Sequence, residues 1–191
     1  QPGSSIKPIA VYSAALQKSF ELSSSGSGFN ITNNGFDKQG DKGWGKFITT
    51  ASIVDDEPTH IEGRQWPNNS DFAFHGIRTF RQALQESLNV CAVKILAQVG
   101  VDYSYDLTEQ FGISSLTDSD RNLAALGLGG MLEGASTLEM ASAYSTFVNG
   151  GVHNEYSCYT KVTTRNGELI LEPTVEQTKV LDPGVAWIMT D

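Results

Sequence analysis

Residues 1–16 read QPGSSIKPIAVYSAAL, which places a serine three positions before a lysine at the start of an apolar run. Apolar residues recur at helical spacing along this run, so the sequence predicts a helix over residues 6–18. Pro8 falls in the first turn of that helix, where a proline is tolerated. Residues three apart lie on one helix face, and the side chains of Ser4 and Lys7 are therefore expected to project together.

A serine and a lysine at this spacing can act as a nucleophile and the base that activates it. A serine hydroxyl is a poor nucleophile until a base removes its proton, and a lysine can do so only when its amine is neutral. Burial and the positive end of the helix dipole both disfavour the charged form of Lys7. Unpaired backbone N–H groups at the helix start can also stabilise an oxyanion. The alternative makes Ser4 a helix N-cap and Lys7 a solvated surface charge.

A second candidate motif is SLN at residues 87–89, which lies where two predicted helices meet. These helices are expected over residues 78–86 and 90–99. Side chains at such a junction can point together into a cleft, which makes Ser87 and Asn89 candidates for the same site as the first motif. The alternative is an ordinary interhelical turn in which both side chains bond the local backbone.

The composition is that of a globular chain with an acidic balance. With 191 residues the chain is long enough for a substantial core in one domain or at most two. A net charge of −9 argues against nucleic acid or an anionic membrane as the main partner, because both reward clustered Lys and Arg. The most apolar helical stretch, residues 90–101, is too short to cross a bilayer, and no signal peptide is seen. We expect any targeting segments to lie outside this chain.

No group of residues has the spacing of a metal or cofactor site. The histidines His60, His75 and His153 are scattered, so surface or loop roles are expected and no bound metal. Cys91 and Cys158 lack CxxC spacing and are expected to be unpaired packing residues, with a disulfide left open.

A long stretch dense in Ser, Gly and Asn, residues 23–50, predicts a surface loop or an inserted flap. Within it, FDKQGD at residues 36–41 departs from the EF-hand pattern, so a solvated loop is expected instead of a calcium site. Residues 48–71 carry at most one short strand-like run. The adjacent carboxylates of residues 55–57 are expected to lie on a solvated loop, because neighbours on an extended segment point to opposite sides.

The clearest helix in the sequence begins after residue 135. Ser136 and Glu139 form a capping box at its start, and Gly150 ends it. Its buried face is expected to be an apolar stripe of Leu138, Ala141, Tyr144 and Phe147.

Three shorter elements are also predicted. One is a helix over residues 107–111. Another is a hairpin between residues 159–164 and 168–171, with Asn and Gly at 166–167 in its turn. The third is a last helix that starts from an N-cap at Asp182. The tryptophans are expected to be packing anchors: Trp44, Trp66 and Trp187.

Three blocks of the sequence together resemble a known family. They are QPGSSIKP, then RQALQESLNVCAVKIL preceded by WPNN, then GASTLEMASAYSTFVNGG, in this order. They resemble successive blocks of the transpeptidase domain of class A, bifunctional penicillin-binding proteins. The resemblance covers residues 1 to about 151, apart from the Ser/Gly-rich stretch. It implies an α+β fold of the penicillin-binding protein and serine β-lactamase type, with residues 1–191 as a partial transpeptidase domain dominated by its helical lobe.

The resemblance also implies roles for the candidate residues. Ser4 resembles the acyl-forming nucleophile and Lys7 the base that activates it, while Ser87 resembles the proton-relay hydroxyl and Asn89 the amide that binds the donor peptide backbone. The implied reaction is a D,D-transpeptidation that crosslinks peptidoglycan stem peptides, with no cofactor. β-Lactam antibiotics would acylate the same serine. The implied location is the extracytoplasmic face of the bacterial cytoplasmic membrane, held by an N-terminal anchor outside this chain, near other cell-wall synthesis proteins.

Two departures from the family pattern limit what is expected of the chain by itself. No KTG or KSG occurs, although the family's third motif supplies a carboxylate anchor and one oxyanion donor from a sheet strand. The glycosyltransferase domain of the class is also missing. We therefore expect a fragment that is inactive or severely impaired in isolation, with activity in the parent protein. Two other functions stay open: a serine β-lactamase or D,D-carboxypeptidase, and a non-catalytic β-lactam sensor or scaffold.

Overall fold

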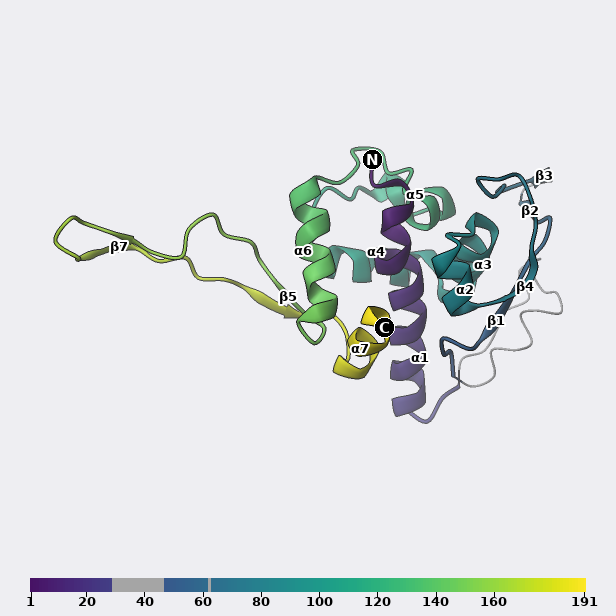
Figure 1. The fold of residues 1–191 in the computed structure, drawn as a ribbon, viewed down its shortest axis with the longest axis horizontal. Coiled ribbons are helices and arrows are strands. Elements are labelled where there is room, and N and C mark those ends of the chain that lie inside the picture. The colour runs from purple at the N-terminus through teal and green to yellow at the C-terminus, as the bar shows by residue number, and fades with distance from the viewer. Residues whose placement is uncertain (29–46, 62) are drawn as a thin grey trace.

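The first helix runs through the middle of the molecule, and the other helices surround it (Figure 1). This computed structural model describes residues 1–28, 47–61 and 63–191. Most of the predicted Ser/Gly-rich insertion, the FDKQGD stretch and Trp44 lie outside the described residues.

The central rod combines three kinds of helix. A 3-10 helix η1 (Gly3–Ile6) leads into a π-helix η2 (Pro8–Tyr12) and then into α1 (Ser13–Ser24). The prediction of a helix over residues 6–18 is therefore confirmed, although the rod extends beyond both limits. At the Ser-rich end of α1, Ser23 Oγ and Ser24 Oγ both donate to Phe20 O at 2.9 Å. Ser25 Oγ donates at 2.8 Å to Leu22 O, one of the last four carbonyls of the helix.

The middle of the rod, residues 9–17, is buried on every side. The rod's fully buried apolar side chains face in all directions around the axis: Ile6, Ile9, Ala10, Val11, Ala14 and Ala15. A helix that is apolar all round must be covered all round. The surrounding helices are α2 (Phe80–Gln85), α3 (Asn89–Val99), α4 (Val101–Gln110), α5 (Leu123–Leu128), α6 (Thr137–Val148) and α7 (Pro183–Thr190), with a short 3-10 helix η4 (Asp118–Asp120).

The described strands form four antiparallel pairs at the margins of this helical body. They are β1 (Ile53–Asp56) with β4 (Gly76–Thr79), β2 (His60–Ile61) with β3 (Arg64–Gln65), β5 (Val152–Asn154) with β8 (Gln177–Lys179), and β6 (Val162–Thr163) with β7 (Leu169–Leu171).

The segment over residues 48–71 is more ordered than its sequence suggests. It contains three short strands, β1, β2 and β3, where at most one was predicted. Asp56 is 1% exposed, so the prediction of a solvated carboxylate loop is wrong for this residue. Asn69 Nδ2 donates to both Asp56 carboxylate oxygens at 2.9 and 2.8 Å, and the His75 backbone N–H donates to Asp56 Oδ2 at 2.9 Å. These hydrogen bonds offset the cost of burying the Asp56 carboxylate, and no local sequence pattern predicts them.

The predicted helix over residues 78–86 begins later, because its first residues belong to a strand. Arg78 and Thr79 are part of β4, and Thr79 then caps α2 in a capping box with Gln82. The predicted helix at 107–111 is the end of the longer α4, whose polar Ser104 is buried and donates to Ala10 O. Helix α5 was not predicted. It is capped by the Asn122 side chain, which accepts from two backbone N–H groups.

Helix α6 confirms its predicted cap and corrects its predicted face. Ser136 and Glu139 form the capping box. Leu138 is 51% exposed, Tyr144 is 37% exposed and Ala141 is exposed as well, so these three members of the predicted apolar stripe are wrong. The buried side chains of α6 are Glu139, Ala143, Thr146 and Phe147. Because this buried face carries the carboxylate of Glu139, a search for apolar residues at helical spacing does not find it.

An arm projects from the helical body between α6 and α7 (Figure 1). The β5–β8 pair forms its root and the predicted β6–β7 hairpin its tip, with Gly167 at φ 87° in the turn. The apolar side chains Leu169, Ile170 and Leu171 of β7 are all exposed. After the arm, Asp182 caps α7 as predicted, by accepting from the Gly184 N–H at 2.8 Å.

Several single-residue expectations also have outcomes. Cys91 is buried and Cys158 exposed, and both are free, so the thiols are unpaired but Cys158 is no packing residue. Trp187 is 68% exposed, and its role as a packing anchor is therefore wrong. His153 is only 6% exposed, because its ring packs against Gly112 and its Nε2 lies 3.0 Å from Ser142 Oγ. Within the described ranges, no helix is long and apolar enough to cross a membrane, and no cluster of metal-ligating side chains occurs.

Candidate active site

The structure brings Lys7, Ser87 and Asn89 together, although eighty residues of sequence separate the first from the others. Lys7 is fully buried at the junction of η1 and η2. Its Nζ lies 2.6 Å from Ser87 O, 3.1 Å from Ser87 Oγ and 2.7 Å from Asn89 Oδ1. These three residues, which the sequence offered as candidates for one site, therefore lie together in the structure, and the site and their chemical roles stay predictions.

Three acceptors around one amine match the three donors of a lysine ammonium. A neutral amine has only two N–H groups, so one of these bonds must change when Lys7 loses a proton. The bond to Ser87 Oγ is the longest of the three, and a hydroxyl can turn from acceptor to donor. Ser87 can therefore hold both forms of the amine.

Burial sets the charge state of this amine. It lowers the pKa of Lys7 from its ordinary value of 10.5 to about 8. A Cys91 thiolate would oppose this shift, but burial raises the pKa of the Cys91 thiol, with nearby Asp56 adding to the effect. Cys91 is therefore neutral near pH 8, and a substantial share of Lys7 is free to accept a proton at that pH.

The backbone at Ser87 is what aims this residue at the lysine. Ser87 lies between α2 and α3 with φ 53°, in the left-handed region that most residues avoid. This turn presents both the carbonyl oxygen and the hydroxyl of Ser87 to the same amine. Unusual backbone of this kind persists only where the surroundings hold it, and Leu88 N and Ser87 N are both bonded back to α2 carbonyls.

Asn69 holds Asn89 in place, and sequence analysis missed it. The Asn69 amide N–H groups donate to Asp56 and to Ala73 O, and its Oδ1 accepts from the Asn89 backbone N–H at 2.8 Å. Asn89 Nδ2 in turn donates to Asn68 O at 2.8 Å. The signal was present in WPNN, but a helix cap supplied from twenty residues away leaves no local pattern.

Ser4 lies on the turn that leads into Lys7, and it is exposed. Its carbonyl oxygen accepts from the Lys7 backbone N–H in η1, which ties the two residues to one turn. Ser4 is not among the partners of the Lys7 amine. Gly129 fixes the start of this turn: Gly3 N donates to Gly129 O at 3.3 Å, and a Cβ at Gly129 would collide with Gly3 O.

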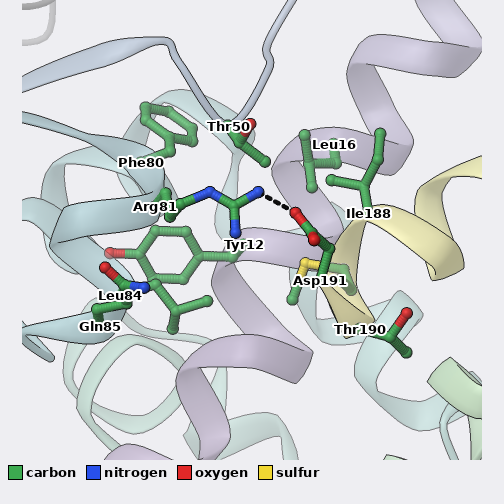
Figure 2. A pocket seen from close by; sticks show the side chains of 11 residues that line it. Tyr12, Leu16, Thr50, Phe80, Arg81, Leu84, Gln85, Ile188, Thr190 and Asp191 are labelled. Atoms are coloured by element: carbon green, nitrogen blue, oxygen red, sulfur yellow. Dashed lines mark hydrogen bonds and ion pairs between the residues drawn. The ribbon is translucent and has the colours of Figure 1, made fainter.

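A separate pocket of about 250 Å³ lies between α1, α2 and α7 (Figure 2). Tyr12, Leu16 and Ile188 contribute apolar walls, and Arg81 forms an ion pair with Asp191 at one side. None of the four predicted site residues lines this pocket.

Comparison with known proteins identifies the family. Residues 44–191 match the family described as "Transpeptidase: Penicillin binding protein transpeptidase domain". The chain belongs to this family. The resemblance expected from the three sequence blocks is thereby confirmed at the level of the transpeptidase domain.

Relatives of known name agree with this membership. The penicillin-binding protein 1A of Clostridium botulinum is 34% identical over 197 residues, which is 99% of this chain and 20% of that protein. The penicillin-binding protein 1A of Neisseria meningitidis is 32% identical over 200 residues, 99% of this chain and 21% of that protein. The chain thus spans about a fifth of the length of these relatives.

Solved structures establish the fold. The chain resembles penicillin-binding protein 1A from Haemophilus influenzae with a TM-score of 0.68 at 21% identity, over 98% of this chain and 28% of that one. PBPA from Mycobacterium tuberculosis gives a TM-score of 0.68 at 19% identity, over 97% of this chain and 41% of that one. The predicted α+β penicillin-binding protein fold is confirmed.

Proposed function

We propose that this chain is the nucleophile-bearing part of a serine D,D-transpeptidase that crosslinks peptidoglycan stem peptides. One observation carries the proposal beyond family membership: the buried Lys7 amine, with a pKa lowered to about 8, lies against Ser87 and Asn89 one turn from an exposed serine, Ser4. A surface lysine would have neither the burial nor these partners. A helix N-cap role for Ser4 finds no support either, because η1 has no side-chain cap.

In the proposed acylation step, neutral Lys7 removes the proton of the Ser4 hydroxyl as Oγ attacks the carbonyl carbon of a D-Ala-D-Ala peptide bond. The attacked carbonyl becomes an oxyanion, which backbone N–H groups at the start of the helical rod stabilise. The proton then passes through the Ser87 hydroxyl to the leaving nitrogen, the peptide bond breaks, and D-alanine departs. The product is an ester between Ser4 Oγ and the stem peptide.

In the proposed transfer step, the amine of a neighbouring stem peptide attacks this ester. Lys7 and Ser87 carry the amine proton back to Ser4 Oγ, the ester bond breaks, and a new peptide bond forms. A β-lactam acylates Ser4 in the same way, but its leaving nitrogen stays tethered in the opened ring, so the acyl-enzyme persists. Asn89 is proposed to bind the donor backbone with the second N–H and the second oxygen lone pair of its amide, in addition to its bonds to Lys7 and Asn68.

The remaining parts of the proposal concern the parent protein. We propose that residues 1–191 are a partial transpeptidase domain, that the third motif comes from a part of the parent outside this sequence, and that no cofactor takes part. The proposed location is the extracytoplasmic face of the cytoplasmic membrane, where stem peptides are reached. Its support is the similarity to proteins named penicillin-binding protein 1A across 99% of the chain.

Product analysis separates this function from its rivals. The parent protein is given a stem peptide ending in D-Ala-D-Ala together with an amine acceptor, and the products are identified by mass. A transpeptidase releases one D-alanine for each crosslinked product, and Ser4→Ala releases none. Release of D-alanine without crosslinks would favour a carboxypeptidase. Fast hydrolysis of the ester formed with penicillin would favour a β-lactamase. A lasting penicillin adduct without turnover of the stem peptide would favour the sensor or scaffold.

A further inference from the structure

Tyr144 reaches from α6 to the turn that carries Ser4. Its hydroxyl donates to the Ser5 carbonyl oxygen at 2.7 Å, across 139 residues of sequence. The hydroxyl oxygen of this contact is the one polar atom of a side chain that the sequence placed in an apolar stripe. An interaction with the residue directly after the proposed nucleophile calls for an explanation.

The Ser5 carbonyl lacks the donor that a 3-10 helix would normally give it. In η1 each carbonyl accepts from the N–H three residues ahead, as Ser4 O does from Lys7 N–H. For Ser5 that residue is Pro8, which has no N–H. The 3-10 pattern therefore stops at this point and the chain changes to the π-helix η2. The Tyr144 hydroxyl supplies a donor where the rod changes its winding.

Tyr144 is itself held by a chain of aromatic contacts that leads to the core. Its ring packs edge-on against Phe147, with centroids 5.7 Å apart and planes at 86°. Phe147 packs against the fully buried Phe111 at 5.4 Å. A phenol ring fixed in this way can hold a backbone carbonyl in a constant place at little cost in side-chain entropy.

The N-terminal side of α6 is also anchored. Glu139 accepts from Ser114 N, Ser114 Oγ and Ser115 N through one carboxylate oxygen, and from Ser136 N through the other. The helix that carries Tyr144 is thus fixed to the loop after α4. The Tyr144 hydroxyl therefore contacts the turn from a helix that is itself held in place.

We propose that Tyr144 is a positioning residue for acyl transfer, which sets the place of the Ser4 hydroxyl relative to the Lys7 amine by holding the Ser5 carbonyl. This inference rests on the proposed function. Tyr144 touches neither the reacting atoms nor the lysine in this arrangement. It acts on the peptide unit between the nucleophile and its base.

The test compares Tyr144→Phe with Tyr103→Phe in the parent protein. Tyr144→Phe removes one oxygen and keeps the ring contacts. Tyr103→Phe also removes one phenol hydrogen bond, from Tyr103 to Glu21 at 3.0 Å, at the opposite end of the rod from Ser4. The readouts are the rate constant of acyl-bond formation with a fluorescent penicillin, the dissociation constant of the preceding complex, the final extent of labelling and the melting temperature.

A positioning role predicts a rate constant lower by about 2- to 10-fold in Tyr144→Phe, the range expected for loss of one hydrogen bond to the reacting turn. The dissociation constant and the final extent of labelling stay unchanged, and Tyr103→Phe keeps the full rate constant. A purely structural role would lower the final labelling or the melting temperature and leave the rate constant of the labelled fraction intact.

Two results would overturn the inference while the proposed function stands: an unchanged rate constant in Tyr144→Phe, or an equal loss in Tyr103→Phe. Absence of a Ser4 adduct in the unaltered protein would overturn the proposed function itself, and the positioning role with it.

Discussion

The amine of Lys7 is enclosed by three oxygens, two of them from a single residue, Ser87. Burying a charge costs free energy, and a buried lysine either gains hydrogen-bond partners or loses its proton. Lys7 shows both effects. The partners hold the ammonium, and burial still lowers its pKa to about 8.

This pKa predicts how acylation depends on pH. In the proposed mechanism Lys7 acts in its neutral form, so we expect the acylation rate to rise tenfold per pH unit below 8 and to level off above it. At pH 6 the rate is about 100-fold below the plateau, because only about one hundredth of the Lys7 amine is deprotonated at that pH. The measurement is the rate constant of penicillin acylation of the parent protein between pH 5.5 and 9.5.

Lys7→Arg is the matched variant for this prediction. A guanidinium keeps the positive charge but does not deprotonate in this range, so we expect acylation to fall by about 100-fold or more and to lose the rise with pH. If Lys7→Arg acylates at the normal rate, Lys7 is not the base.

Two substitutions of Ser87 separate the contribution of its hydroxyl from the contribution of its backbone conformation. Ser87→Ala and Ser87→Gly both remove the hydroxyl at 3.1 Å and keep the carbonyl at 2.6 Å. Both should slow acylation to the same degree. At φ 53° an alanine is strained and a glycine is not, so Ser87→Gly should be more stable by about 1 kcal/mol.

Urea unfolding gives the stabilities of this pair and penicillin acylation gives the rates. A difference between the two variants in acylation rate would mean that backbone placement, and not the hydroxyl, is what Ser87 contributes.

At the scale of elements, the buried carboxylate of Glu139 decides how α6 is attached. Burial by itself would raise its pKa, but hydrogen bonds from Ser136, Ser114 and Ser115 outweigh burial and hold the pKa at about 2. The ordinary value is 4.5, so the unfolded chain takes up this proton more readily than the native one. The stability from Glu139 is therefore present above pH 4.5 and lost as the pH falls toward 2.

We expect Glu139→Gln to lower the free energy of unfolding by about 1–3 kcal/mol at pH 7, because the amide points a donor at backbone N–H groups that need an acceptor. The difference from the unaltered protein should shrink between pH 4.5 and 2. Glu133→Gln is the control, since Glu133 is exposed on the loop before α6. Denaturant unfolding at several pH values measures both, and a difference that stays constant with pH would contradict the role of the charge.

The elements also show how far sequence patterns reach. Capping boxes and the Asn-Gly turn are local signals, and the α6 start, the α7 start and the β6–β7 hairpin were all predicted. The boundaries that failed depend on partners distant in the chain. Strand β1 needs β4 and Asn69 to bury Asp56. Helix α5 was missed for another reason: its cap, Asn122, is local, but six residues are too short for a helical pattern to stand out.

The same division holds for the candidate site. Ser4 and Lys7 are one turn apart, so their pairing follows from sequence spacing, and Ser87 with Asn89 followed from a helix junction. Asn69 and Tyr144 could not be found in this way. Each bonds a main-chain atom of a remote residue, and such contacts leave no spacing to detect.

Across the whole molecule, stability and exposure are unevenly distributed. The helical body holds the buried core, and the arm between α6 and α7 has its apolar side chains in solvent. We expect Ile170→Thr, at 61% exposure in β7, to change the free energy of unfolding by less than about 0.5 kcal/mol.

Leu126→Ala provides the contrast, since Leu126 of α5 is fully buried and its truncation should cost about 2–5 kcal/mol. Thermal and urea unfolding compare the two variants. A large loss in Ile170→Thr would show that the arm packs against something in the native protein.

The central claim is that Ser4 is a nucleophile activated by Lys7, and intact-mass analysis of penicillin acylation tests it most directly. The parent protein is incubated with penicillin beside its Ser4→Ala variant, and the modified peptide is mapped. We predict one covalent adduct, located on Ser4 and absent from the variant. A well-folded protein that forms no adduct, or one whose adduct persists in Ser4→Ala, would contradict the account.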